Sequence, residues 1–159
     1  MWILLATLVA VAADLSVSTD AAGTVHASAV VPATPAVALA LVRDPVAVLK
    51  LSGEAGTLAA KPTATCYDVA YALENILINV AYTARACQTV TGVRSQLVQS
   101  DSFKQMSTEW TVREVPGGSE LVYTYTAELN VPVPNWLIRK RTEASIATMM
   151  QAVVGKLGG

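Results

Sequence analysis

The stretch PNWLIRKRTEASIATMMQAVVGKL, residues 134–157, decides the fold of this chain. Its apolar and small side chains recur at steps of three and four, which predicts one long amphipathic helix. The stripe consists of Ile138, Thr142, Ser145, Ile146, Met149, Val153 and Leu157. Pro134 suits the start of a helix, and glycines at 155, 158 and 159 lie near its end. The alternating segments before it are expected to form a sheet, one face of which this helix covers.

Two adjacent segments within residues 63–88, TATCYDVAYALE and ILINVAYTARACQ, alternate in polarity as the two strands of a hairpin do. We expect Cys66 to lie opposite Cys87 in this hairpin. In that register Asp68 falls opposite Arg85 on the same face, and the apolar residues of both strands share the other face. One register therefore accommodates a cysteine pair, a charge pair and two apolar faces.

The remaining segments add further strands and two short helices. GTVHASAVVPAT, residues 23–34, is rich in valine and predicts the first strand. Thr34-Pro35 and Asp44-Pro45 are helix-start signals, and Gly53 ends the second helix. Residues 57–128 are typical of a run of strands, so we expect a curved antiparallel sheet of about six or seven strands in an α+β fold.

The N-terminal segment MWILLATLVAVAA, residues 1–13, is apolar but too short to span a bilayer. It fits the hydrophobic region of a secretory signal, with Ala10-Val11-Ala12 as a small-x-small cleavage site. The basic leader is missing, since no Lys or Arg precedes Arg43, and a first strand is the alternative interpretation. We expect a signal over residues 1–13, one domain over residues 14–159 and a periplasmic or secreted location.

The two cysteines are most simply a disulfide if the chain is exported. Closing a loop of about 20 residues stabilises a fold by roughly 3 kcal/mol under the loop-entropy model. Free thiols are the alternative. Zinc is not expected, because two cysteines cannot complete a tetrahedral site and the single histidine, His26, is remote in sequence.

Composition and motifs exclude several classes of function. The formal net charge is -1, which gives no reason to expect nucleic acid as a partner. The basic run at residues 139–141 is interpreted as a solvated helix face, with an anion site as the alternative. No catalytic, metal-binding or cofactor motif is present. The carboxylates Asp101, Glu109, Glu114 and Glu128 do not converge and are expected to form outward salt bridges.

The succession VHASAVVPATPAVALALVRDP, SDSFKQMSTEWTVREVPGGSELVYTYTAEL and VPVPNWLIRKRTEASIATMM resembles the START-like superfamily, also called the helix-grip or SRPBCC group. The resemblance covers residues 23–157. It implies a sheet wrapped around the C-terminal helix with an apolar cavity between them. Members bind lipids, sterols, quinones or polyketides, and a minority are cyclases or hydrolases. The pair Cys66 and Cys87 departs from most cytoplasmic members and fits an exported branch.

The candidate cavity wall is the inner face of the strands together with the helix stripe. It comprises Tyr67, Val69, Tyr71, Ile78, Val80, Tyr82, Trp110, Leu121, Tyr123, Tyr125, Ile146, Met149 and Val153. Apolar walls with several phenol hydroxyls suit a ligand pocket, and a filled core is the alternative.

The sequence is compatible with three functions, two of which use such a cavity. The favoured one is non-enzymatic binding or transport of a hydrophobic small molecule. A cyclase or hydrolase would need an inward carboxylate with a shifted pKa, which the strand faces do not supply. A structural domain without a pocket would instead show an exposed apolar patch. The sequence leaves the ligand and the oligomeric state open.

Overall fold

The structure is a computed structural model that describes residues 14–74 and 79–159, so the predicted signal segment lies outside the described residues. Within them the chain forms eight strands and three helices. In chain order these are β1 (Ser16–Thr19), β2 (Val25–Val31), α1 (Pro35–Val42), α2 (Pro45–Ser52), β3 (Gly56–Thr63), β4 (Cys66–Glu74), β5 (Asn79–Gln88), β6 (Gly92–Ser100), β7 (Phe103–Val115), β8 (Gly118–Leu129) and α3 (Asn135–Lys156).

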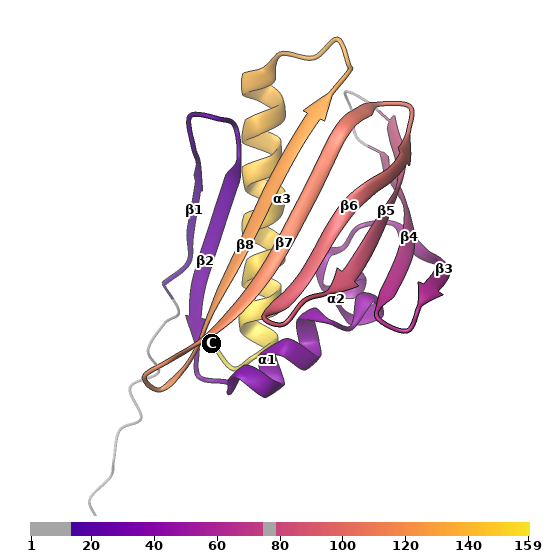
Figure 1. The fold of residues 1–159 in the computed structure, drawn as a ribbon. Helices are drawn as coiled ribbons and strands as arrows, with labels where there is room; N and C mark the ends of the chain where they lie inside the picture. The colour runs from indigo at the N-terminus through magenta and orange to yellow at the C-terminus, as the bar shows by residue number, and fades with distance from the viewer. Residues whose placement is uncertain (1–13, 75–78) are drawn as a thin grey trace, which may run out of the picture.

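The strands form a single antiparallel sheet in the order β1-β2-β8-β7-β6-β5-β4-β3. The sheet curves around α3, and α1 and α2 lie at the end of the molecule where α3 terminates (Figure 1). The predicted α+β helix-grip fold is thereby confirmed. The strand count is higher than the predicted six or seven, because the short polar segment SVST forms an extra edge strand, β1, before the predicted first strand.

Local sequence explains the two short helices. The Thr34 side chain accepts a hydrogen bond from the Val37 amide at 3.4 Å, and α1 begins at Pro35. Asp44 caps α2 more fully, because its carboxylate accepts from the amides of Val46 and Ala47, both at 3.1 Å. Gly53 ends α2 with a φ of 70°, a left-handed conformation that glycine adopts without steric cost.

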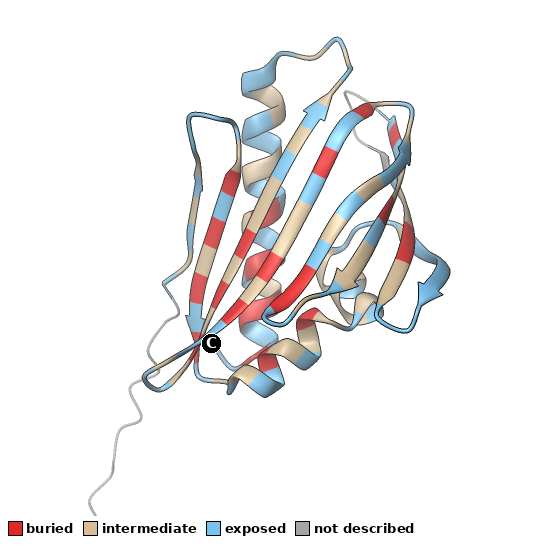
Figure 2. Cartoon of the chain, in the orientation of Figure 1, coloured by how far each residue is buried: buried red, intermediate tan, exposed pale blue. Residues whose placement is uncertain are grey.

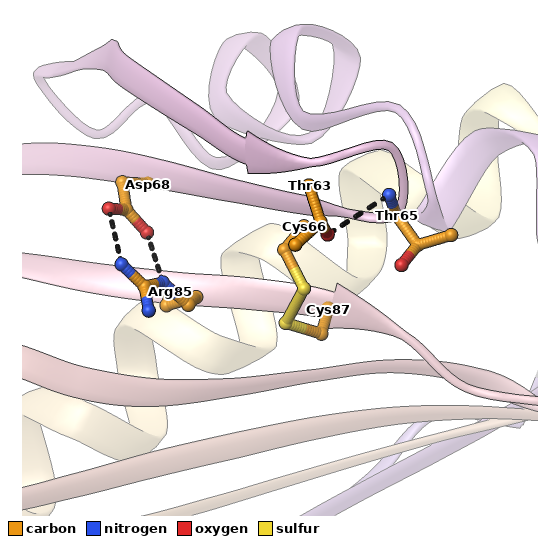
Figure 3. The surroundings of a disulfide bond; sticks show 6 residues. All are labelled: Thr63, Thr65, Cys66, Asp68, Arg85 and Cys87. Atoms are coloured by element: carbon orange, nitrogen blue, oxygen red, sulfur yellow. Dashed lines mark hydrogen bonds and ion pairs between the residues drawn. A yellow bond between two sulfur atoms is a disulfide. The ribbon is translucent and has the colours of Figure 1, made fainter.

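The hairpin of β4 and β5 has the predicted register. Cys66 pairs with Cys87 and Asp68 with Arg85, and the two cysteines form a disulfide whose Cα atoms lie 4.1 Å apart. Arg85 donates two hydrogen bonds to Asp68, at 2.7 and 3.0 Å, beside the disulfide (Figure 3). The covalent bond and the charge pair therefore fix the same two strands on the same face.

The core is concentrated around the C-terminal half of α3. Buried positions gather there and on the facing parts of the strands, whereas the N-terminal half of the helix is exposed or half-buried (Figure 2). Met150 and Val153 have 0% exposed surface, and Leu121 on β8 is equally inaccessible. A second, smaller cluster consists of Val80, Ala84, Phe103 and Met106. The sequence periodicity placed one continuous stripe on α3, but only its second half is closely packed.

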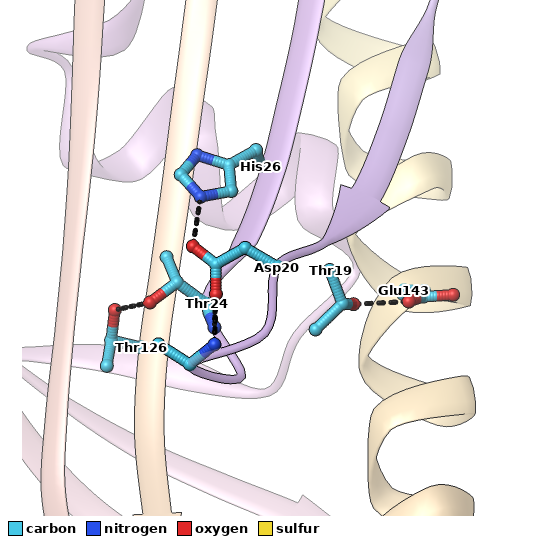
Figure 4. A network of polar contacts seen from close by, with 7 residues as sticks. Thr19, Asp20, Thr24, His26, Thr126 and Glu143 are labelled. Carbon is cyan, nitrogen blue, oxygen red and sulfur yellow. Dashed lines mark hydrogen bonds and ion pairs between the residues drawn. The ribbon is translucent and has the colours of Figure 1, made fainter.

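A polar network holds the start of the described chain against the rest of the fold (Figure 4). Asp20, in the turn between β1 and β2, lies 2.8 Å from Nε2 of His26 and accepts a hydrogen bond from the Thr24 amide at 3.0 Å. The Thr19 hydroxyl contacts the carboxylate of Glu143 and thereby links β1 to α3. The single histidine of the chain therefore lies on β2 and contacts this turn through Asp20.

Candidate ligand cavity between the sheet and the long helix

A cavity of about 790 Å³ lies between α3 and the strands β4–β8, with the α1–α2 segment along one side. This volume falls within the range of roughly 300–1,000 Å³ that is typical of small-molecule sites. The α3 helix packs directly on β1, β2 and α2, so it approaches one half of the sheet and leaves space over the other. The cavity therefore lies over the half of the sheet that α3 does not contact closely.

Most of the predicted wall residues line this cavity. They are Tyr67, Val69, Tyr71, Val80, Tyr82, Trp110, Tyr123, Tyr125, Ile146 and Met149. The structure places Leu121 and Val153 in the closed core instead, where both side chains have 0% exposed surface. Ile78 lies outside the described residues. Alternation of polar and apolar residues predicts which face of the sheet a side chain is on. It does not predict which part of that face packs against the helix and which part lines the cavity.

Aromatic rings cover the sheet side of the cavity. Tyr71 and Tyr82 stack with ring centroids 4.7 Å apart, and Phe103 meets Tyr82 edge to face at 5.0 Å. Trp110 and Tyr123 form a tilted pair at 4.7 Å. These contacts give the wall a fixed shape, because ring pairs of this kind add to the stabilisation from burial alone.

Four of the cavity phenols, those of Tyr71, Tyr82, Tyr123 and Tyr125, have a raised pKa and remain protonated over the physiological range. Burial raises the pKa of Tyr71 to about 12, and the nearby carboxylate of Glu54 acts in the same direction. Burial and Glu54 likewise raise the pKa of Tyr82, Tyr123 and Tyr125 above its usual value. A neutral phenol can both donate and accept a hydrogen bond, so the apolar wall carries several orienting hydroxyl groups.

The helix side of the cavity is built from small and polar side chains. Thr142 and Thr148 line it, and their hydroxyls donate to the carbonyls of Ile138 at 2.8 Å and Ala144 at 3.0 Å within the same helix. Ser145 lies between them on the same wall. Because these side chains are short, α3 leaves the space that a row of leucines would fill.

Glu54 is a wall residue that the strand faces did not reveal. It lies in the loop between α2 and β3, and it is the only Asp or Glu among the described residues that line the cavity. Its side chain is accessible, yet surrounding protein desolvates the carboxyl and raises its pKa. The accessibility of the side chain and the desolvation of its carboxyl are consistent with each other when the accessible surface faces the cavity. The cavity is large enough to hold water. The sequence signal was the polar run Ser52-Gly53-Glu54 between two apolar segments.

Two arginines also reach the cavity wall. Arg43 is held in place by main-chain carbonyls, because its guanidinium donates to Gly92 and Val90 at 3.3 Å and to Thr89. Arg141 lines the cavity from the N-terminal half of α3 and is exposed. The described lining thus includes one carboxylate and two guanidinium groups.

Outside the cavity, three features of the described residues bear on function, namely metal ligation, surface ion pairs and the apolar character of the helices. Residues 14–74 and 79–159 contain no group of three or more His, Cys, Asp or Glu side chains that could hold a metal ion. Two of the carboxylates expected to form outward salt bridges do so, Glu109 with Arg94 at 3.0 Å and Glu128 with Lys104 at 3.4 Å. None of the described helices combines the length and the apolar character needed to cross a membrane.

No protein-family model matches the sequence, and no curated protein shows significant similarity to it. The fold, in contrast, has many counterparts among solved structures. A START superfamily protein from Mycobacterium smegmatis is 16% identical, with a TM-score of 0.69 over 84% of this chain and 96% of that chain. A STAR-related lipid transfer protein from Xanthomonas axonopodis is also 16% identical, with a TM-score of 0.69 over 91% of this chain and 99% of that chain.

The Zhui aromatase/cyclase from Streptomyces sp. R1128 is a further neighbour, at 13% identity and a TM-score of 0.70 over 84% of this chain and 92% of that chain. Identities at this level establish the shared fold and not a shared activity. The chain therefore shares its helix-grip fold with these three proteins, namely a START superfamily protein, a lipid transfer protein and an aromatase/cyclase.

Proposed function

We propose that this protein binds or carries a hydrophobic small molecule in the cavity between the sheet and α3. The observation that carries the proposal is the cavity itself, of about 790 Å³, with its aromatic and aliphatic wall. Wide apolar contact supplies affinity, and the few phenol hydroxyls and Glu54 supply orientation. The volume suits a lipid, sterol, quinone or polyketide.

We further propose that the protein works outside the cytoplasm, in the periplasm or after secretion. The disulfide between Cys66 and Cys87 supports this location, because such bonds persist in oxidising compartments and are rare in the cytosol. Thiol titration of protein recovered from its own host, with and without reductant, tests the proposal. Two reactive thiols without reductant would count against it.

The binding function is tested by native mass spectrometry of protein purified from its own host, followed by solvent extraction of the bound material. We expect an apolar ligand that leaves the protein on denaturation. A protein that carries nothing, and that takes up no apolar fluorescent probe such as N-phenyl-1-naphthylamine, would contradict the proposal.

A matched pair of helix variants locates the ligand. Ser145→Trp adds a large ring on the cavity wall, whereas Ala144→Trp adds the same ring at an exposed neighbour that does not line the cavity. We expect the first variant to lose probe binding and the second to retain it. Equal binding by both would place the probe elsewhere on the protein.

A second candidate function is an acid–base enzyme acting on a hydrophobic substrate. It is supported by Glu54, a cavity carboxyl whose raised pKa brings its proton closer to neutral pH. Mass spectrometry of the extracted ligand distinguishes the two functions. If the protein is an enzyme, material extracted from Glu54→Gln will be converted to a product when it is incubated with the unchanged protein, and if it is a carrier the material will be recovered unchanged.

A further inference from the structure

Glu54 lines the same cavity as the rings of Tyr71 on β4, Tyr82 on β5, and Tyr123 and Tyr125 on β8, and it is the only Asp or Glu among the described lining residues. Burial is the main cause of the raised pKa of these phenols, and the Glu54 carboxylate acts in the same direction. The carboxylate and the tyrosine rings thus belong to one cavity wall, on which a single ligand can contact both.

Glu54 has no cationic partner among the described residues. None of the ion pairs formed within residues 14–74 and 79–159 includes it. Arg43, one of the two arginines of the wall, already donates to three carbonyls between Thr89 and Gly92. An accessible carboxylate on the cavity wall that has no ion-pair partner among the described residues is free to accept a hydrogen bond from a ligand, and a hydrogen bond to a charged group is stronger than one between neutral groups.

We propose that Glu54 is the polar anchor of the cavity and that the ligand is an apolar molecule with a hydroxyl or ammonium head group and no anionic group. The inference rests on the proposed binding function and adds a chemical class to it. An ammonium or hydroxyl group donates to the Glu54 carboxylate while the apolar body contacts the rings of Tyr71 and Tyr82. A fatty acid, in contrast, would bring a second carboxylate toward the first.

Rings near the carboxylate favour the same class of head group. Tyr71 and Tyr82 belong to the wall, and aromatic rings attract cations that lie over a free face. Arg141 is the side chain that could instead hold an anionic head group, because it lines the cavity from α3 and forms no ion pair among the described residues. The two possibilities predict opposite head-group preferences.

The test is a series of three probes that share one alkyl chain, namely dodecylamine, 1-dodecanol and laurate. Each of the three compounds is titrated as a competitor of the dye N-phenyl-1-naphthylamine for the full chain at pH 8. The concentration of the compound stays below the value at which it forms micelles. We expect dodecylamine and dodecanol to bind at least about tenfold more tightly than laurate, since a hydrogen bond to a charged group has about that effect. Glu54→Gln should weaken dodecylamine binding about tenfold and reduce the discrimination against laurate.

Glu114→Gln is the matched control, because Glu114 is exposed near the end of β7 and does not line the cavity. It should leave all three affinities unchanged. Laurate binding as tight as dodecylamine binding, or a preference for laurate that is lost in Arg141→Gln, would overturn the inference while leaving the binding function intact. If the dye and all three probes fail to bind, the binding function fails as well. Should Glu54→Gln not fold, the probe series on the unchanged protein decides the question alone.

Discussion

The ring of Tyr71 on β4 lies against the ring of Tyr82 on β5, with centroids 4.7 Å apart and planes only 16° from parallel. Both rings line the cavity, and burial raises the pKa of each phenol. Both phenols must stay neutral while they are buried in the wall, so alkaline pH should destabilise this part of the fold.

We expect the free energy of unfolding to fall as the pH rises from about 10 to about 12. The unfolded chain releases the Tyr71 proton near 10.0, whereas the folded protein retains it until about 12, so the folded state binds more protons in this window. The slope should be about 1 kcal/mol per pH unit for each such group. Urea unfolding at stepped pH measures it. Tyr71→Phe should be less sensitive to pH, and an unchanged slope would contradict the assignment.

Loss of the disulfide should destabilise the protein without changing its fold. Cys66 and Cys87 are separated by 21 positions, and cross-linking a loop of that size stabilises a fold by about 3 kcal/mol under the loop-entropy model. The double variant Cys66→Ser/Cys87→Ser should therefore unfold at lower urea concentration than the oxidised protein. Reduced unchanged protein is the control, and it should match the double variant. Equal stability of the oxidised and reduced forms would show that the bond contributes nothing.

The ion pair beside the disulfide should make stability sensitive to acid. The hydrogen bonds from Arg85 hold the pKa of Asp68 below its usual value of 3.8. The unfolded chain therefore binds the proton first, so stability is complete above the usual pKa and is lost as the pH falls through the lower, folded value. Asp68→Asn should be less stable than the unchanged protein at neutral pH, and the difference should shrink in acid. Urea midpoints between pH 6 and pH 2 test this, with Glu114→Gln as the control.

Gly92→Ala should disturb the strand pair that carries Trp110. A Cβ atom at Gly92 would lie 1.8 Å from the Trp110 carbonyl oxygen, a distance that only backbone movement can relieve. We expect a loss of about 2–4 kcal/mol. Gly155→Ala is the matched control, because a Cβ there meets no atom within 4 Å and alanine favours the helix. Thermal or urea unfolding that ranks the two variants equally would contradict this account.

The register of β4 and β5 could be predicted because several independent constraints coincide in it. Cys66, Asp68, Arg85 and Cys87 all select the same alignment, and the structure has that alignment. The caps of the two short helices were equally readable, since Thr34 and Asp44 directly precede prolines. A helix cap depends on residues next to each other in sequence, and the register depends on a single pair of strands. Both can therefore be predicted from the local pattern of residues.

The parts that could not be predicted depend on long-range packing. The strand β1 is short and polar, and it exists as a strand because it pairs with β2 and contacts α3. Glu54 belongs to a loop, where no periodicity assigns a direction to a side chain. Leu121 and Val153 have the pattern of wall residues, but the depth at which α3 meets the sheet places them in the core.

The pairing of β2 with β8 has a consequence for how the protein assembles. Every other strand pairing joins neighbours in the chain, whereas this one brings Val25 beside Tyr125 and Val31 beside Ser119. The segment from β3 to β8 can form as consecutive hairpins, while the pairing of β2 with β8 must close a loop that includes both short helices and the five strands β3–β7. Pulsed hydrogen exchange during refolding should therefore protect the β7–β8 amides before those of β2. The aromatic wall of the cavity then forms early, and β1 and β2 pair last, with the edge of a sheet that is already largely formed.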